Sequence, residues 1–365
     1  MPTAIPRRAV LMSLAAPGLA HAQGAWPTRP IRVVVPFATG GGTDVTMRLL
    51  APKLAEILGV PVVVENRPGA GSTVGTDYVA KSPPDGTTFV LATLSSTGIA
   101  AGLYANLPYD PARDLAAIAP TVFIPTALAV TQRGWSVRDL AGFVAALRAR
   151  PGAASYGSSG IGTTGHLASV NFLRATQTEA VHIPYRGGGQ SFAALISGET
   201  QFTHDIPSLL RPFHDAGSAR VLFINSERRS PLLPEVPTFA EVGLPDYKAY
   251  SWYGLFGPAG TPRPVMERLA TATEQAMRDP QIAARLAELG TPPMLGYTPD
   301  RFAQYVRDEI ETWVPLVRAA GAQGEWPGPG GVGQPVRCGD RRAGLARPAR
   351  DLRRHEWGHP SQAVR

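Results

Sequence analysis

The fold is decided by the stretch IRVVVPFATGGGTDVTMRLL, residues 31–50. Its first seven residues, Ile31–Phe37, are largely apolar, which predicts a strand buried on both faces. A glycine turn, Gly40-Gly41-Gly42, follows, and apolar side chains recur at helical spacing through Asp44–Leu58. We therefore expect a β-strand, a glycine-rich turn and an α-helix in succession.

The same alternation continues outward from this unit and predicts an α/β protein with a mostly parallel sheet. Further strands are expected at Pro61–Glu65, Thr88–Thr93, Ile118–Thr131, Ala154–Gly157, Ala180–Pro184, Thr200–Thr203, Arg220–Ile224 and Ser251–Phe256. Further helices are expected at Thr73–Lys81, Ser136–Ala149, Thr164–Ala175, Gly189–Ser197, Pro264–Arg278, Pro280–Leu289 and Pro299–Ala320. Two α/β lobes fit this order better than one sheet, with lobe 1 at 26–125 and 232–321 and lobe 2 at 126–231.

The N-terminus has the three parts of an export signal in the required order. Arg7 and Arg8 precede the apolar stretch Ala9–Ala20, and Ala20-His21-Ala22 resembles a cleavage site. We expect a signal peptide at residues 1–22, cleaved after about Ala22, by the general or the twin-arginine route. The alternative is a buried N-terminal helix. No later segment approaches the ~20 apolar residues of a membrane span.

The positive charge lies at the ends of the chain. The net charge is +7, of which Arg7 and Arg8 supply +2 and residues 322–365 supply +4, so subtraction leaves +1 for the body. Nucleic acid is therefore not expected as a partner. Residues 322–365 lack apolar periodicity, and we expect a disordered basic tail. It could be a membrane-surface or nucleic-acid arm, but we favour a non-conserved extension.

Residue types suited to metals and redox chemistry are sparse. Cys338 is the only cysteine, which excludes an intramolecular disulfide and a thiolate metal cage. The histidines show no metal-ligand spacing. We expect no metal and no cofactor.

Two glycine-, serine- and threonine-rich loops each lead from a predicted strand to a predicted helix. The first spans Pro36–Asp44 and the second Gly157–His166. Small residues let a ligand approach the backbone, and helix N-termini present unpaired N–H groups with partial positive charge. A carboxylate could be held between two such loops. Taken alone, either loop is better explained as an ordinary tight turn, with Asp44 and Thr163 or Thr164 as N-cap residues.

Enzymatic interpretations of these loops are weaker. The spacing for a dinucleotide site is missing, and there is no Gly-Lys-Ser/Thr phosphate loop. Gly157–Ile161 narrowly misses the hydrolase motif Gly-x-Ser-x-Gly, because Ile161 replaces the last glycine. A triad of Ser159, His166 and Asp205 remains an alternative, which would make the protein an exported serine hydrolase. Arg186 could bring a cation to the cleft or lie in an exposed turn.

A series of ordered motifs resembles one receptor family. They are Pro36-Phe37 through Gly42-Thr43-Asp44, Val64–Gly71, Pro84-Asp85-Gly86, Pro108–Asp110 to Asp114-Leu115, Gly157-Ser158 to His166-Leu167, Ile183–Gly187, Pro234–Thr238, Glu241–Pro245 and Trp252–Leu255. Together they resemble the periplasmic, Bug-type receptors of tripartite tricarboxylate transporters, over about Trp26 to Gly321. The resemblance implies a type II periplasmic-binding-protein fold, two α/β lobes with a ligand cleft between them.

The resemblance also implies a site. The first lobe would contribute Phe37, Gly42, Thr43 and Asp44, with Ser95, Ser96 and Thr97 at a strand end. The second lobe would contribute Ser158, Thr163 and Thr164, with Arg186 and Asp205 near the cleft. The run Ile99–Gly102 and Thr87 depart from the family pattern, as does the tail after Gly321.

The function expected from this resemblance is capture of a small carboxylate in the periplasm for a membrane-embedded transporter, by a monomer without enzymatic activity. The ligand could be a tricarboxylate, a dicarboxylate, an amino acid or an aromatic acid, and the motifs do not rank them. Besides the hydrolase, a transcription regulator's effector domain can share the fold. It would need a DNA-binding domain ahead of the first lobe, where only the leader stands.

Overall fold

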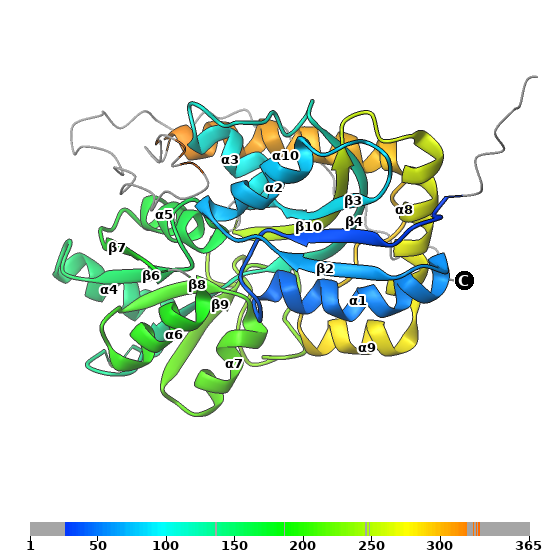
Figure 1. Cartoon of the computed structure of the whole chain (residues 1–365). Helices are drawn as coiled ribbons and strands as arrows, with labels where there is room; N and C mark the ends of the chain where they lie inside the picture. The colour runs from blue at the N-terminus through cyan, green and yellow to red at the C-terminus, as the bar shows by residue number, and fades with distance from the viewer. Residues whose placement is uncertain are drawn as a thin grey trace, which may run out of the picture.

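The structure, a computed structural model, describes residues 26–135, 137–185, 187–244, 247, 249–319, 324, 326 and 328. Figure 1 shows two β-sheets side by side, each with helices on both faces. The predicted two-lobed α/β fold is confirmed. We call the part built on the first sheet the first lobe and the part built on the second sheet the second lobe.

The first sheet has the strand order β2-β1-β3-β10-β4. Its strands are β1 (Ile31–Val35), β2 (Val62–Asn66), β3 (Thr88–Thr93), β4 (Leu115–Pro125) and β10 (Tyr250–Pro258). Buried side chains alternate between its faces, so each face has its own core cluster. One face is covered by α1 (Gly42–Leu58), α8 (Arg263–Arg278) and α9 (Pro280–Glu288), and the other by α2 (Thr73–Ala80), α3 (Gly98–Leu103) and α10 (Pro299–Ala319). A short 3₁₀ turn at Ala70–Ser72 precedes α2, and another at Leu94–Ser96 precedes α3.

The second sheet has the order β7-β6-β8-β5-β9. Its strands are β5 (Ala127–Thr131), β6 (Ser155–Ser158), β7 (Val181–Pro184), β8 (Phe202–Asp205) and β9 (Ala219–Ile224). Helices α4 (Leu140–Ala149) and α5 (Thr164–Thr176) cover one face, and α6 (Gly188–Ser197) and α7 (Pro207–Asp215) cover the other. The two sheets share one pattern of strand order, although the sequence has no repeat at a fixed period.

The expected mostly parallel strand direction is confirmed, because four of the five strands in each sheet run the same way and one is reversed. In each sheet two of the four strand pairings are antiparallel. The reason is that one strand enters each sheet from the other lobe and runs against its neighbours. That strand is β10 in the first sheet and β5 in the second. The sequence prediction joined β4 and β5 into one range and omitted α3 and α7.

The chain crosses between the lobes at Thr126 and again at Ala249. Asn225 fastens the two crossings together: its backbone N–H donates to Thr126 O (2.7 Å), and its side-chain Oδ1 accepts from Ala249 N (3.1 Å). The Thr126 hydroxyl also donates to Ala249 O. Apolar side chains between β9 and β10, including Leu233 and Phe239, pack against the second sheet. We therefore propose that lobe 2 extends to Ala249, beyond the boundary at 231 expected from the sequence.

Both chain ends bear on the domain predictions. The predicted signal peptide lies outside the described residues, as does most of the predicted tail at 322–365. Two described residues of the tail contact the first lobe: Gly324 forms a β-bridge with Tyr104, and Trp326 Nε1 donates to Thr73 Oγ1 (2.7 Å). The packed part of the chain thus extends past Gly321. Within the described ranges, no helix is both long and apolar enough to cross a membrane.

Candidate ligand-binding cleft

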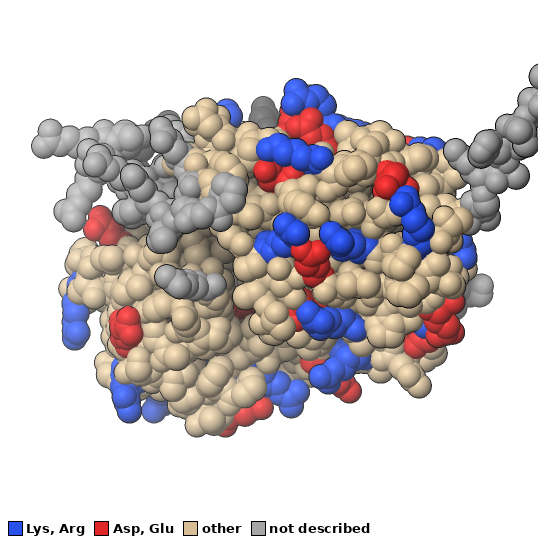
Figure 2. Space-filling model, viewed as in Figure 1, with Lys and Arg blue, Asp and Glu red and all other residues tan. Residues whose placement is uncertain are grey.

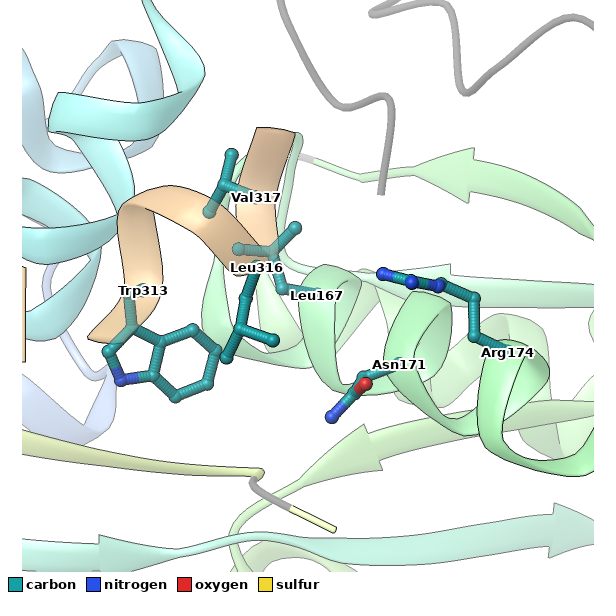
Figure 3. A pocket seen from close by; sticks show the side chains of 6 residues that line it. All are labelled: Leu167, Asn171, Arg174, Trp313, Leu316 and Val317. Atoms are coloured by element: carbon teal, nitrogen blue, oxygen red, sulfur yellow. The ribbon is translucent and has the colours of Figure 1, made fainter. Parts of the chain in front are cut away.

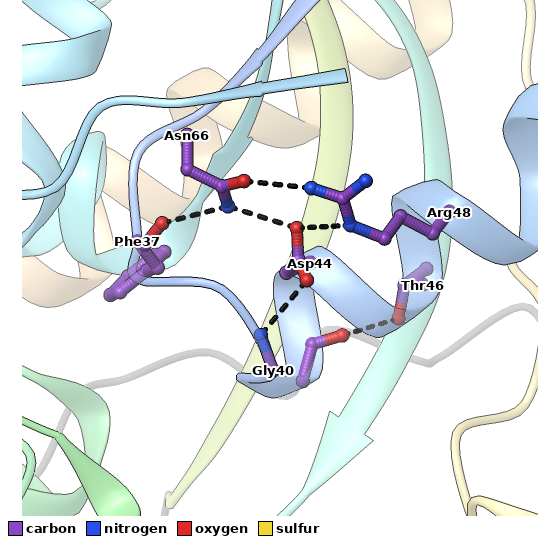
Figure 4. A network of polar contacts seen from close by, with 7 residues as sticks. Phe37, Gly40, Asp44, Thr46, Arg48 and Asn66 are labelled. Carbon is purple, nitrogen blue, oxygen red and sulfur yellow. Dashed lines mark hydrogen bonds and ion pairs between the residues drawn. The ribbon is translucent and has the colours of Figure 1, made fainter.

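The first glycine loop is fixed by Asp44 on the first turn of α1. Asp44 Oδ2 accepts from the N–H of Gly40 (2.9 Å), and Oδ1 accepts from Arg48 Nε (2.9 Å) and Asn66 Nδ2 (2.9 Å). The Asn66 amide also donates to Phe37 O (3.0 Å). Figure 4 shows this network joining the loop, the start of α1 and the end of β2. Asp44 therefore organises the loop.

The carboxylate of Asp44 is buried and charged. Burial opposes ionisation, but the hydrogen bonds from Gly40, Asn66 and Arg48 outweigh it, and the pKa of Asp44 lies below its usual value. Both oxygens are occupied by these partners, so we propose that Asp44 acts on a ligand through the loop. Phe37 was also expected at the site. Its ring packs against the first-lobe core, and its carbonyl oxygen accepts a hydrogen bond from Asn66.

Gly42 and Thr43 begin α1 at the side of the cleft. A methyl group built on Gly42 would lie 3.2 Å from the Tyr253 hydroxyl and 3.4 Å from Ile206 Cδ1. Ile206 belongs to the second lobe, so Gly42 lies where the two lobes meet. Thr43 is buried, and its side chain acts to lower the pKa of Tyr253. Burial raises the pKa of Tyr253 to about 12, which keeps its hydroxyl a neutral donor.

The loop after β3 separates its three predicted residues. Ser96 Oγ accepts from Thr93 N (3.0 Å), and Thr97 Oγ1 donates to Thr93 O (2.9 Å), so both hydroxyls serve the loop itself. Ser95 instead faces the second lobe, where its Oγ lies 3.5 Å from Thr164 Oγ1. Of the three, Ser95 is the residue that reaches across the cleft.

Two histidines form hydrogen bonds with the second glycine loop. Ser158 Oγ bonds His182 Nε2 (2.7 Å) and Gly160 O (3.0 Å), and His166 Nδ1 accepts from Gly162 N (3.2 Å). The two imidazole rings stack with centroids 4.1 Å apart. Burial lowers the pKa of His182 to about 4, and burial together with the neighbouring His182 places the pKa of His166 well below its ordinary value. Both rings are neutral near pH 7.

Thr163 and Thr164 stand at the start of α5. Thr163 Oγ1 donates to Gly160 O (2.8 Å) and so tightens the loop. Thr164 is the first helical residue and faces Ser95 of the first lobe. The first N–H groups of a helix lack partners within the helix, and they carry partial positive charge. The start of α1 thus faces Ile206 of the second lobe, and the start of α5 faces Ser95 of the first lobe.

Asp205 lies at the carboxyl end of β8, beside the same loop. Its Oδ1 accepts from Ile206 N (2.8 Å), and a methyl group on Gly188 would lie 3.5 Å from both Asp205 Oδ2 and Ser159 Oγ. Burial raises the pKa of Asp205 to about 6, although the Ile206 N–H acts against this. Ile206, the next residue, packs into the first-lobe core, so Asp205 lies at the boundary between the lobes.

The triad considered from the sequence is not assembled among the residues described. Asp205 bonds a backbone N–H, His166 Nδ1 accepts a backbone N–H, and the serine bonded to a histidine is Ser158, which is buried. Arg186, also predicted for the site, lies outside the described residues. The described part of the chain holds no group of acidic, histidine or cysteine side chains suited to a metal.

Three cleft residues were missed by sequence reasoning. Tyr253 lies in the Trp252–Leu255 motif, Asn66 lies in the Val64–Gly71 motif, and Ile206 follows Asp205. Position within a motif was the available signal for the first two. What the sequence lacks is the course of β10, which carries Tyr253 back between β3 and β4.

A second place where the lobes meet is the pocket in Figure 3. Leu167, Asn171 and Arg174 of α5 line it on one side, and Trp313, Leu316 and Val317 of α10 on the other. Leu167 packs into the first-lobe core.

On the face drawn in Figure 2, basic and acidic side chains are interspersed.

Comparison with known proteins identifies the family. Residues 46–322 match the tripartite tricarboxylate transporter family receptor. The chain is 35% identical to the protein BugT of Bordetella pertussis over 301 residues, which are 82% of this chain and 91% of BugT. An R. palustris protein solved with adipate superposes with a TM-score of 0.75 at 34% identity, covering 81% of this chain and 98% of that one. MatC from Rhodopseudomonas palustris, solved with bound malate, gives 0.74 at 31% identity, covering 80% and 100%.

The match covers most of the chain, and the fold and the paired loops agree with it. The chain therefore belongs to the tripartite tricarboxylate transporter receptors, which are periplasmic solute-binding proteins.

Proposed function

We propose that this receptor captures a small carboxylate between the starts of α1 and α5 and delivers it, without chemical turnover, to a membrane-embedded transporter. The observation that carries the proposal is that each glycine-flanked helix start faces the other lobe: a methyl group on Gly42 of α1 would lie 3.4 Å from Ile206 Cδ1, and Thr164 of α5 lies 3.5 Å from Ser95. Paired helix N-termini bind an anion without a metal or an arginine. The adipate and malate in the related structures are small carboxylates of this kind.

Gly42 gives the proposal a direct test. A ligand that accepts hydrogen bonds from the first N–H groups of α1 must approach the backbone, and a β-carbon on Gly42 would stand between Tyr253 and Ile206. We expect Gly42→Ala to weaken carboxylate binding about tenfold, which corresponds to about 1.4 kcal/mol. Titration calorimetry with the acid that most raises the melting temperature in a thermal-shift screen measures this.

The matched control is Gly189→Ala. Like Gly42, Gly189 lies in the first turn of a helix, in this case α6 of the second lobe. A methyl group on Gly189 would meet nothing within 4 Å. It should leave the affinity unchanged. A screen in which no carboxylic acid stabilises the protein, together with turnover of an ester, would replace the receptor proposal by the serine hydrolase.

Export and delivery belong to the same proposal. We propose that residues 1–22 direct the chain to the periplasm and are removed, which leaves Gln23 as the first residue. Mass spectrometry of the protein from a periplasmic extract checks this. An intact Met1 in that fraction would contradict cleavage. We propose a monomer that binds the transporter subunits when closed; light scattering tests the monomer.

A further inference from the structure

The cleft contains an acidic side chain where an anion is proposed to bind. Asp205 is half-buried, and the next residue, Ile206, approaches the start of α1, where its Cδ1 would lie 3.4 Å from a methyl group on Gly42. The same carboxylate lies on the second-lobe side, near Ser159 and Gly188 at the start of α6. Asp205 therefore borders the proposed carboxylate site from the second lobe, close to the first.

One oxygen of Asp205 is available to a ligand. Oδ1 accepts from Ile206 N, whereas Oδ2 forms no hydrogen bond with any described residue. No described cation forms an ion pair with Asp205 either. Burial raises its pKa to about 6, so the group is mostly ionised at pH 7.5 and can only accept hydrogen bonds.

An ionised carboxylate beside a captured anion disfavours binding unless a donor lies between the two. We infer that Asp205 accepts a hydrogen bond from the ligand, and that the preferred ligand is a carboxylate bearing a hydroxyl or ammonium substituent. This inference rests on the proposed function. A site built to accept a substrate O–H or N–H discriminates strongly against the analogue that lacks it, because the buried acceptor is then left unpaired.

The test uses matched sets of acids that differ by the donor alone. Succinate is compared with malate and aspartate, and glutarate with 2-hydroxyglutarate and glutamate, by titration calorimetry at pH 7.5. We expect the wild-type protein to bind a donor-bearing member at least about tenfold more tightly than its plain diacid. Asp205→Ala should reduce this ratio below about threefold, with the plain diacid binding as well as before or better.

Two variants guard the interpretation. Asp205→Asn retains the shape of the side chain without its charge and should also bind the plain diacid at least as well as wild type. Glu199→Gln changes an exposed second-lobe carboxylate that bonds Tyr185, and it should leave every ratio unchanged. Thermal unfolding without ligand checks that each variant folds.

Three outcomes would overturn the inference. A wild-type protein that binds plain diacids as tightly as their substituted partners removes the donor preference. Asp205 variants that weaken all acids equally assign the residue a structural role, or pairing with a cation of the chain. A protein that binds no carboxylate at all overturns the proposed function and the inference with it, and so is distinguishable from the first two.

Discussion

At the scale of single residues, the most informative side chain is Asp44. It was expected to touch the ligand, yet its two oxygens accept from Gly40, Arg48 and Asn66. Its removal would leave several donors unsatisfied at a buried position. We expect Asp44→Ala to lower the free energy of unfolding by about 2–4 kcal/mol and to weaken binding because the loop loses its shape. Urea denaturation and calorimetry measure the two effects.

The control for Asp44 is a carboxylate in an exposed ion pair. Glu56→Ala removes one of the two acidic partners of Lys53 on the surface of α1 and should cost less than about 1 kcal/mol, without affecting affinity. An Asp44→Ala protein with wild-type affinity would remove the loop network from ligand binding.

Buried histidines make a residue-scale prediction about pH. Burial lowers the pKa of His182 to about 4 and of His204 to about 3, and His166 is shifted in the same direction. The unfolded chain takes up protons on these groups below about pH 6.5, before the folded protein does. The contribution of these histidines to the free energy of unfolding is therefore fully present above about pH 6.5 and is lost as the pH drops toward 4. His182 alone accounts for about 3 kcal/mol at the end of that range.

Asp205 acts in the opposite direction. Its raised pKa means that the folded protein binds a proton between about pH 6 and 4 before the unfolded chain does, which favours the folded state. The destabilising effect of the three histidines is larger than the stabilising effect of this one carboxylate, so we expect the free energy of unfolding to fall as the pH is lowered. Urea midpoints from pH 7.5 to 4.5 measure it, and His182→Asn should flatten the curve. A wild-type midpoint that stays constant over this range contradicts the prediction.

At the scale of elements, the crossings between lobes depend on one side chain. Asn225 Nδ2 donates to Tyr247 O (2.9 Å) while its Oδ1 accepts from Ala249 N (3.1 Å), and the residue is buried. Asn225→Ala leaves both backbone groups unsatisfied, and we expect it to cost about 2–4 kcal/mol in urea denaturation. Gln304→Ala, which removes an exposed bond to Asp308, should cost at most about 0.5 kcal/mol. Equal costs for the two variants would show that Asn225 does not fasten the crossing.

The sequence predicted elements better than their arrangement. Apolar runs and helical spacing located β1, α1, β3, α8 and α10 because burial dictates those patterns. Tertiary pairing is not written in local periodicity, so the antiparallel entry of β10 and β5 was missed, and with it the place of Tyr253 in the cleft. The two glycine loops were found because their small residues are visible locally. The sequence does not show which hydroxyls face the cleft, because this depends on hydrogen bonds inside the loop. Ser95 faces the second lobe, whereas Ser96 and Thr97 bond within the loop.

At the scale of the whole molecule, the lobes are in contact on both sides of the cleft. Leu167 of the second lobe packs into one first-lobe core cluster, and Ile206 packs into the other. Ser95 approaches Thr164 between them. The lobes are therefore in contact in this structure, and α5 and α10 line the two sides of the pocket in Figure 3. We expect residues that contact the other lobe to control closure.

Gly162 is such a residue, and it allows closure to be tested directly. A methyl group on Gly162, in the second glycine loop, would collide with Leu103 Cδ2 of α3 in the first lobe. Leu103 is buried, so it has little room to move. We expect Gly162→Ala to hold the lobes apart, with ligand affinity at least about tenfold lower and a radius of gyration in small-angle scattering that no longer decreases when ligand is added.

Backbone strain must be separated from the collision, because Gly162 has φ +75°. Gly59→Ala provides the control: Gly59 has the same φ of +75° but faces open space after α1, so it should cost stability without weakening binding. Combining Gly162→Ala with Leu103→Ala should restore closure, since the obstructing side chain is removed. If the double variant binds no better than Gly162→Ala alone, the contact between Gly162 and Leu103 does not govern closure.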